Sequence, residues 1–426
     1  MSDATPGTSV QTGAQEDALQ AGIFFRAKER PPDHWRGVVI NVSAAAEKAA
    51  VRDALAQLWA MWSALGQGHV RDLARTRSDD PEVKVDGGGL TVLLGFGRSL
   101  FGDERHMPIL FAEDLRPPEL ARLMPAAPFP SLPWAKDARP LEGQGDFFVQ
   151  LFGASELVVN RAIVEAQKLI DDRNLPLQIV TFYRGAHRED GRSWIDFHDG
   201  VNNLRSEERR TAIEITGADP AWLRGGTFAA FLQIQVDLKA WRRLTREQQE
   251  LLVGRHKLSG CPVVSATLAD DRTAQLAFKP GCPLRGFPTR TAQAIGPEPL
   301  EVDPDFIDPP PASGLLKTSH IHRSNFNRGS PAADGNNRIF RQGYEFLEPS
   351  GSGGLHVGLN FISFQRSLLA LRRILGTTGW LGDVNFGGTA EQPLAAPPLP
   401  LMSVASGGLY AIPPRGDPFP GAPLFG

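Results

Sequence analysis

The chain has 426 residues, which is more than one typical hydrophobic core supports, so we expect two domains or a duplicated unit. Its formal net charge is −3 and its acidic and basic residues are dispersed, which argues against nucleic-acid and membrane partners. No apolar stretch reaches the length of a membrane span, and residues 1–18 lack the pattern of a signal peptide. We therefore expect a disordered leader at 1–18 and a cytoplasmic location.

Short apolar runs at 19–27 and 35–44 predict strands, and apolar positions recur every three or four residues over 45–65, which predicts an amphipathic helix. Two more strands are expected at 90–97 and 145–155, followed by a helix that begins at Glu156. The order strand, helix, strand, strand, helix, strand is the ferredoxin-like pattern.

The second half repeats this theme. Strands are predicted at 226–238 and 356–365, and helices at 246–256 and 366–375. We therefore expect an α+β fold of two ferredoxin-like halves, each an antiparallel sheet with helices packed outside.

Proline-rich or glycine-rich stretches at 124–145 and 303–315 are expected to be long loops. Beyond about residue 390 the prolines, which have no N–H donor, argue against a helix or a central strand. The expected organisation is a leader at 1–18, halves at 19–204 and 205–385, and a Pro/Gly-rich tail at 386–426.

The two cysteines, Cys261 and Cys282, are not spaced as a CxxC pair. Free thiols in a reducing compartment are therefore expected.

The segment 192–204 places Asp196, His198 and Asp199 just before Gly200. On these residues alone, an Asp-Gly turn with solvated side chains is the simplest interpretation.

Residues 319–328, SHIHRSNFNR, contain His320 and His322. Residues two apart share a face of a strand but point about 200° apart around a helix, so one small ion could bind both only in an extended backbone. No third histidine or cysteine lies at ligand spacing nearby. Ligation by one of the pair and ordinary hydrogen bonding both remain open at this point.

Several segments taken together resemble one family, the dye-decolorising peroxidases, over residues 19 to about 380. In chain order they are LQAGIFF, LTVLLGFGRSLF, GDFFVQLFGA, WIDFHDGVNN, GGTFAAFLQIQVDLKAWRRL, LLVGRHKLSG, SHIHRSNFNR, RIFRQGYEF and GLNFISFQ. That family consists of haem peroxidases built of two ferredoxin-like halves. The resemblance implies one haem b per chain, bound in the C-terminal half.

The family's GxxDG motif corresponds here to residues 196–200, so the resemblance gives Asp199 the place of the catalytic distal aspartate, with Asp196 in place of the first glycine. The family's proximal histidine begins a run HIRR or HIRK and maps onto His320, the expected iron ligand, while His322 stands where the family has arginine. The distal arginine follows about twenty residues later and maps onto Arg341.

Other residues map onto the walls and rim of the family's haem site. Leu359 and Phe361 correspond to the apolar residues over the distal haem face. Arg323, Arg328 and His322 are candidates to pair with the haem propionates, although the arginine that ends the family's run comes one place late here.

The resemblance implies a peroxidase that reduces hydrogen peroxide and oxidises dyes or other aromatic reductants one electron at a time. Asp199 would be the acid–base residue, Arg341 would stabilise O–O cleavage and His320 would hold the iron. Because a free aspartate ionises at about pH 3.9, activity is expected to be better in mildly acidic solution. Tyr344 and Trp380 are candidate electron relays, against ordinary packing.

Two other readings stay open. The first is a haem-binding or iron-recovery protein of the same fold with little turnover. The second is cargo of a protein shell, with the tail as its address. Exposed edges of two sheets also make self-association plausible.

Overall fold

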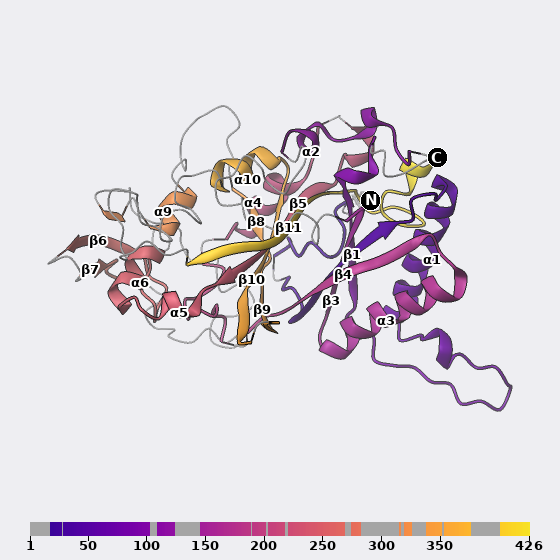
Figure 1. Cartoon of the computed structure of the whole chain (residues 1–426), viewed down its shortest axis with the longest axis horizontal. Helices are drawn as coiled ribbons and strands as arrows, with labels where there is room; N and C mark the ends of the chain where they lie inside the picture. The colour runs from indigo at the N-terminus through magenta and orange to yellow at the C-terminus, as the bar shows by residue number, and fades with distance from the viewer. Residues whose placement is uncertain are drawn as a thin grey trace, which may run out of the picture.

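The computed structural model, drawn in Figure 1, describes residues 18–27, 29–102, 109–123, 145–188, 190–201, 203–217, 220–268, 274–282, 315–316, 319–325, 338–351, 353–375 and 401–426. Its strands are β1 His34–Val42, β2 Thr91–Gly97, β3 Phe147–Gly153, β4 Leu177–Ala186, β5 Thr227–Val236, β6 Val263–Leu268, β7 Ala274–Phe278, β8 Phe340–Arg341, β9 Tyr344–Pro349, β10 Leu355–Gln365 and β11 Met402–Ile412. Its α-helices are α1 Lys48–Gly66, α2 Pro118–Leu123, α3 Glu156–Arg173, α4 Ser206–Ile213, α5 Leu238–Trp241, α6 Arg246–Val253, α9 His320–Asn325 and α10 Leu368–Leu375. Short 3-10 turns lie at Arg71–Leu73, Arg98–Leu100, Glu113–Leu115, Ala221–Leu223 and Ala422–Phe425.

Within the described residues, most strands join one mixed-order sheet, β5-β11-β2-β3-β1-β4-β9-β10-β8, in which β5 also pairs with β10. All pairings in it are antiparallel. The hairpin of β6 and β7 is separate. Figure 1 places this hairpin with α5, α6 and α9 at one end of the molecule, and α1 and α3 at the other.

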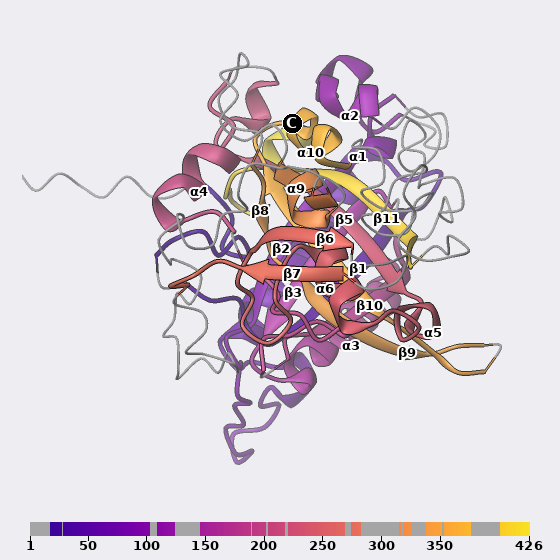
Figure 2. The same cartoon turned by 90° about the vertical axis from the view of Figure 1, so that its left-hand side faces the viewer.

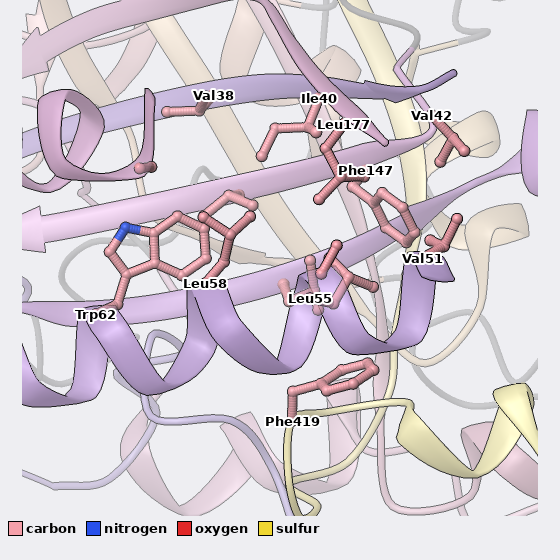
Figure 3. Close-up of a cluster of buried hydrophobic side chains, with 14 of the residues drawn as sticks. Val38, Ile40, Val42, Val51, Leu55, Leu58, Trp62, Phe147, Leu177 and Phe419 are labelled. Carbon is pink, nitrogen blue, oxygen red and sulfur yellow. The ribbon is translucent and has the colours of Figure 1, made fainter. Parts of the chain in front are cut away.

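The first part of the chain has the predicted order β1, α1, β2, β3, α3, β4. Helix α1 buries one stripe, including Val51, Leu55, Leu58 and Trp62, against the sheet, as Figure 3 shows. These positions recur at the spacing of one helix face. The indole N–H of Trp62 donates to the carbonyl oxygen of Ala162 on α3 at 3.0 Å, which ties the two helices together.

The predicted strand at 19–27 is wrong, because this segment contains turns and bends. The side chain of Gln20 takes over the role of strand pairing: its Nε2 donates to the carbonyl oxygens of Leu94 and Pro413 at 3.0 and 2.9 Å, and its Oε1 accepts from the N–H of Leu94 at 2.9 Å. A buried, irregular segment can persist when a side chain satisfies neighbouring backbone groups in this way.

The predicted strands and helices of the second half correspond to β5, α6, β10 and α10. The expectation that the chain beyond residue 390 forms no central strand is wrong, because β11 lies between β5 and β2 in the sheet. Its sequence, MSVASGGLYAI, contains no proline, so each of its residues keeps the backbone N–H that a central strand needs.

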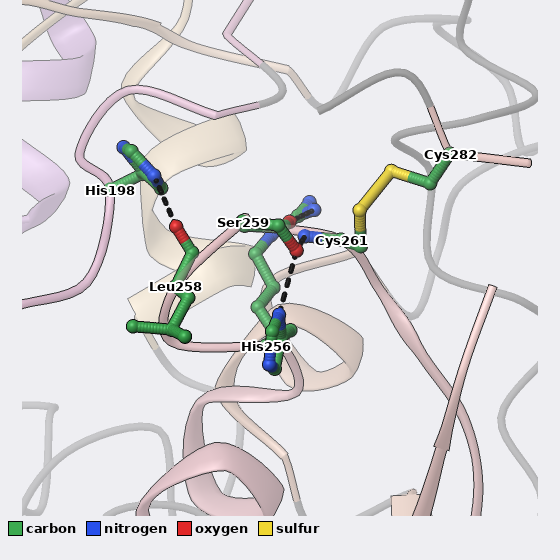
Figure 4. The surroundings of a disulfide bond; sticks show 8 residues. His198, His256, Leu258, Ser259, Cys261 and Cys282 are labelled. Carbon is green, nitrogen blue, oxygen red and sulfur yellow. Dashed lines mark hydrogen bonds between the residues drawn. A yellow bond between two sulfur atoms is a disulfide. The ribbon is translucent and has the colours of Figure 1, made fainter. Parts of the chain in front are cut away.

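The expectation of free thiols is also wrong. Cys261 and Cys282 form a disulfide, with Cα atoms 6.1 Å apart (Figure 4). The β6–β7 hairpin lies between the two cysteines and brings the segments before β6 and after β7 together. The sequence separation of 21 residues gave no sign of this contact. The thiol argument for a cytoplasmic location therefore falls away, and that location stays a prediction. Among the described residues, no helix is long and apolar enough to cross a membrane.

Candidate active site

The loop before Gly200 is a tight turn held by its own backbone. The N–H of Asp199 donates to the carbonyl oxygen of Gly191 at 3.0 Å, and the Asp199 carboxylate accepts from the N–H of Gly200 at 2.7 Å. Both Asp196 (φ 65°) and Gly200 (φ 69°) adopt the left-handed region. Glycine suits that region best, so Asp196 carries a conformational cost where the family motif has glycine.

Arg192 fastens this loop to residues 257–258. Its guanidinium donates to the carbonyl oxygens of Lys257 and Leu258 at 2.7 and 2.8 Å. The Nε2 atom of His198 lies 2.9 Å from the same Leu258 oxygen, the contact drawn in Figure 4, and 3.0 Å from Arg192. His198 therefore helps to hold the loop that carries Asp199 against residues 257–258.

Arg341 lies on β8 and is clamped by Asn203. The Asn203 side chain accepts from the backbone N–H of Arg341 at 3.1 Å and donates to its carbonyl oxygen at 2.8 Å. The Arg341 guanidinium donates to the carbonyl oxygen of Val201 at 3.1 Å. Burial lowers the pKa of Arg341 and the Asp199 carboxylate raises it, so a cation and an anion face the same space.

His320 is the first residue of α9. Burial, together with the positive charges of Arg341, Arg255 and Arg323, lowers the pKa of His320 to about 3. The imidazole is therefore neutral near pH 7, which is the form that ligates metals.

These side chains meet at one cavity of about 260 Å³. Five of the residues predicted for the site line it, namely Asp199, His320, Arg341, Leu359 and Phe361. Most of the rest of the wall is apolar, including Ile195, Val201, Ile234, Val236, Val253, Ile321, Ile339, Ile374 and Met402.

The other predicted residues have different positions. His322 is buried, and its Nδ1 lies 2.6 Å from the hydroxyl of Ser319. Arg323 is buried as well, and neither residue is among the described residues that line the cavity. Because this segment is helical, His320 and His322 point to different sides, as expected for a helix. Arg328 lies outside the described residues.

Of the two candidate relays, Trp380 lies outside the described residues. Tyr344 is fully buried, and its ring stacks on those of Trp35 and His187, with centroids 5.6 and 4.2 Å away. Tyr344 could therefore relay an electron only between other buried groups, because a reductant in solution cannot contact it.

Sequence reasoning missed three charged residues that also line the cavity, Arg255, Arg338 and Glu345. The signal for Glu345 was an acidic residue between two aromatic residues of β9, four places after Arg341. Arg255 and Arg338 carried no comparable signal, since arginines are common at the ends of helices and strands.

Among the described residues, no group of three or more histidine, cysteine, aspartate or glutamate side chains is placed to hold a metal ion. Within that part of the chain, His320 is the predicted iron ligand with the clearest access to the cavity. An iron held there would need further ligands from a bound cofactor.

Comparison with known proteins bears on this site. Residues 190–383 match the family model described as "Dyp-type peroxidase, C-terminal". Residues 190–383 are similar to the Dyp-type peroxidase family. They include the Asp199 loop, His320 and Arg341, so the resemblance inferred from the sequence motifs is confirmed.

Solved Dyp-type peroxidases share the fold along nearly the whole chain. A DyP-type peroxidase from Streptomyces coelicolor is 20% identical, with a TM-score of 0.63 and coverage of 96% of this chain and 95% of that one. A DypB variant in complex with heme, from Rhodococcus jostii, is 17% identical, with a TM-score of 0.54 and coverage of 93% and 96%. At such identities the likeness shows the fold.

Curated relatives include deferrochelatases. The protein of Shigella flexneri serotype 5b is 25% identical over 295 residues, which are 66% of this chain and 58% of that protein. The protein of Escherichia coli O157:H7 is 25% identical over 180 residues, 41% of this chain and 34% of that protein. The chain thus matches less than two thirds of these relatives' length.

Proposed function

We propose that this chain is a haem-dependent peroxidase that reduces hydrogen peroxide and oxidises dyes or other aromatic reductants one electron at a time. One observation carries the proposal: Asp199, His320 and Arg341 come from three separate segments and line the same cavity. Simple carriage of a cofactor would need neither the carboxylate nor the guanidinium at that place.

The residues of the cavity fit a haem b. The neutral imidazole of His320 would hold the iron, and the apolar walls suit the flat face of a porphyrin. Arg255 and Arg338 also line the cavity and are suited to the propionate carboxylates. Bound haem would supply the redox chemistry of iron.

Asp199 is proposed to move the peroxide proton. Peroxide must lose a proton from one oxygen and gain one on the oxygen that leaves as water, so one group has to act first as base and then as acid. The hydrogen bonds that fix the Asp199 loop to Gly191 and Gly200 hold the carboxylate in place for both steps.

Arg341 is proposed to stabilise the negative charge that develops as the O–O bond breaks. A guanidinium stays cationic even when burial lowers its pKa, so it supplies charge without exchanging a proton. Leu359 and Phe361, beside it in the cavity wall, exclude water and thereby strengthen this electrostatic effect. Bulky reductants would be excluded too, and their electrons would have to travel through aromatic side chains.

The predicted two ferredoxin-like halves belong to the same proposal. The first unit has the sheet order β4-β1-β3-β2, and the order β11-β5-β10-β9 supports an equivalent second unit. We therefore propose a boundary near residue 204, as expected, with the second half extended beyond residue 385 to include β11. The haem would lie in this second half.

The test is to load the full chain with haem, add peroxide, and follow the haem absorption together with the oxidation of a dye. Asp199→Asn and Arg341→Leu should each lower the rate of the peroxide reaction by about 10²-fold or more. Asp196→Asn is the matched control, since Asp196 lies in the same loop, its exposed side chain pairs with Lys257 at 3.7 Å, and asparagine tolerates its φ of 65°. Unchanged turnover in both site variants would overturn the assigned roles.

A second candidate is iron recovery from haem, and the deferrochelatase relatives favour it. Incubation of the haem-loaded chain under reducing conditions, with a ferrous chelator present, separates the two. Release of iron with recovery of the intact metal-free ring, and little dye oxidation, would favour iron recovery. In either case His320→Ala should change the spectrum of the bound iron.

Self-association, attachment to a protein shell and the absence of nucleic-acid or membrane partners stay predictions.

A further inference from the structure

Glu345 is a buried acid in the wall of the cavity. It lies on β9 directly opposite Leu359 of β10, and on its other side it pairs with Ala186 of β4. Directly opposite residues of antiparallel strands share a face of the sheet, so the carboxyl lies on the same side as Leu359. Both side chains line the cavity with Asp199.

The Glu345 carboxyl is only half satisfied by the protein. The side chain is 8% exposed, and its Oε2 accepts from the backbone N–H of Trp194 at 3.3 Å. Its other oxygen, Oε1, and the indole Nε1 of Trp194 have no hydrogen-bond partner within the described part of the chain. Two such buried polar atoms beside a cavity indicate that water or a ligand completes their hydrogen bonding.

The charges around Glu345 favour its neutral form. The charges of Asp199 and Asp190 act against ionisation of Glu345, and Arg188, the cation that favours it, already binds Asp190 at 2.6 Å. Burial first, and then the charge of Asp199, raise the pKa of Glu345 well above its usual range, while the Trp194 N–H and Arg188 lower it less.

Two further titratable groups on the neighbouring elements are His187, after β4, and Arg341, on β8. Burial lowers the pKa of His187, so its ring is neutral, and Arg341 faces Asp199. None of these groups gives Glu345 a cation of its own.

We propose that Glu345 is the proton-exchanging partner of Asp199, which it supplies through water in the cavity. This inference rests on the proposed peroxidase function and deepens it. In the step, a proton leaves the neutral Glu345 carboxyl and is accepted by the Asp199 carboxylate, so one negative charge moves from Asp199 to Glu345 and no electron moves. Glu345 then takes a proton from solvent.

The overall chemistry requires such a supply. Reduction of one hydrogen peroxide to two waters consumes two electrons, from the reductant, and two protons. Asp199 by itself only moves the peroxide's own protons from one oxygen to the other. The additional protons must enter a cavity with mostly apolar walls, and Glu345 is the second acidic side chain among the described residues that line it.

The decisive variant is Glu345→Gln in the haem-loaded full chain. Glutamine keeps the shape and the carbonyl acceptor for the Trp194 N–H but cannot release a proton. Glu348→Gln is the matched control, because Glu348 lies on the same strand, opposite His356, and is more exposed. Glu345→Asp keeps an acid in place, should Glu345→Gln fold poorly.

Two readouts are needed. The first is the infrared C=O band of a protonated carboxyl near pH 7, which should be present in the wild type and in Glu348→Gln and absent in Glu345→Gln. The second is the pH profile of steady-state dye oxidation, which includes the steps that consume outside protons. Glu345→Gln should turn over about tenfold more slowly and lose the decline that the wild type shows as rising pH ionises Glu345. Glu345→Asp should keep both the band and the decline.

The proposal is overturned if the wild type has no such band, if the band survives in Glu345→Gln, or if the pH profile and rate of that variant match the wild type. The infrared band does not depend on turnover. Normal peroxide turnover in Asp199→Asn would instead overturn the proposed function, so the two failures are distinguishable.

Discussion

Asn203 holds the backbone of Arg341 in place, and its removal should disturb both stability and chemistry. Its side chain accepts from the N–H of Arg341 and donates to the carbonyl oxygen of the same residue, at 3.1 and 2.8 Å. It also accepts from the backbone N–H of Leu204 at 3.0 Å. The Asn203 side chain thus makes the backbone hydrogen bonds that a neighbouring strand would make to Arg341, which lies on the edge strand β8.

The magnitude follows from these three hydrogen bonds. Each contributes about 0.5–1.5 kcal/mol net to the free energy of unfolding, and Asn203 is partly buried. Asn203→Ala should therefore cost about 2–3 kcal/mol. Asn203→Asp keeps the acceptor and loses only the donor to the Arg341 carbonyl oxygen, so it should cost less, about 1 kcal/mol.

The assay pairs urea unfolding with stopped-flow measurement of the peroxide reaction in haem-loaded protein. A displacement of Arg341 of about 1 Å can lower the rate by up to about 10²-fold, so Asn203→Ala should be slow. In an Arg341→Leu background the same substitution should add almost nothing to the loss of rate. An Asn203→Ala protein with wild-type stability, or an equal loss of rate in both backgrounds, would refute the reasoning.

Three other outcomes are expected. Cys261→Ser should lower the free energy of unfolding by about 3 kcal/mol, because the disulfide to Cys282 closes a loop of 21 residues, and a reductant should weaken the wild type but not the variant in urea unfolding. Asp196→Val should cost about 1–2 kcal/mol by the same measurement, since a β-branched residue is strained at φ 65°, whereas Asp196→Gly should be tolerated. In the haem-free chain, His320 has a folded pKa of about 3, below its unfolded value near 6.5, so the stability that it contributes is present above pH 6.5 and is lost as the pH falls toward 3. Unfolding curves of His320→Gln between pH 7 and 4 should accordingly show a smaller loss of stability than those of the wild type.

The sequence by itself determined the elements with strong periodicity and the residues with fixed spacing. The apolar stripe of α1 and the apolar run at 228–232 of β5 needed no tertiary information, because the stripe has the period of a helix and a short continuous apolar run is typical of a strand buried on both faces. The candidate site was predicted from the resemblance to a family, since residues 196–200 correspond to its aspartate motif and Arg341 follows His320 at the family's distance.

Only the tertiary structure decided features in which distant segments complete one another. Gln20 replaces a strand by pairing with backbone groups of residues 94 and 413, and β11 joins the sheet from a proline-rich tail. The disulfide depends on a hairpin that brings its ends together. Glu345 becomes a candidate proton donor because folding buries it beside Asp199, and the pKa of a carboxyl is determined by such surroundings, which local sequence does not encode.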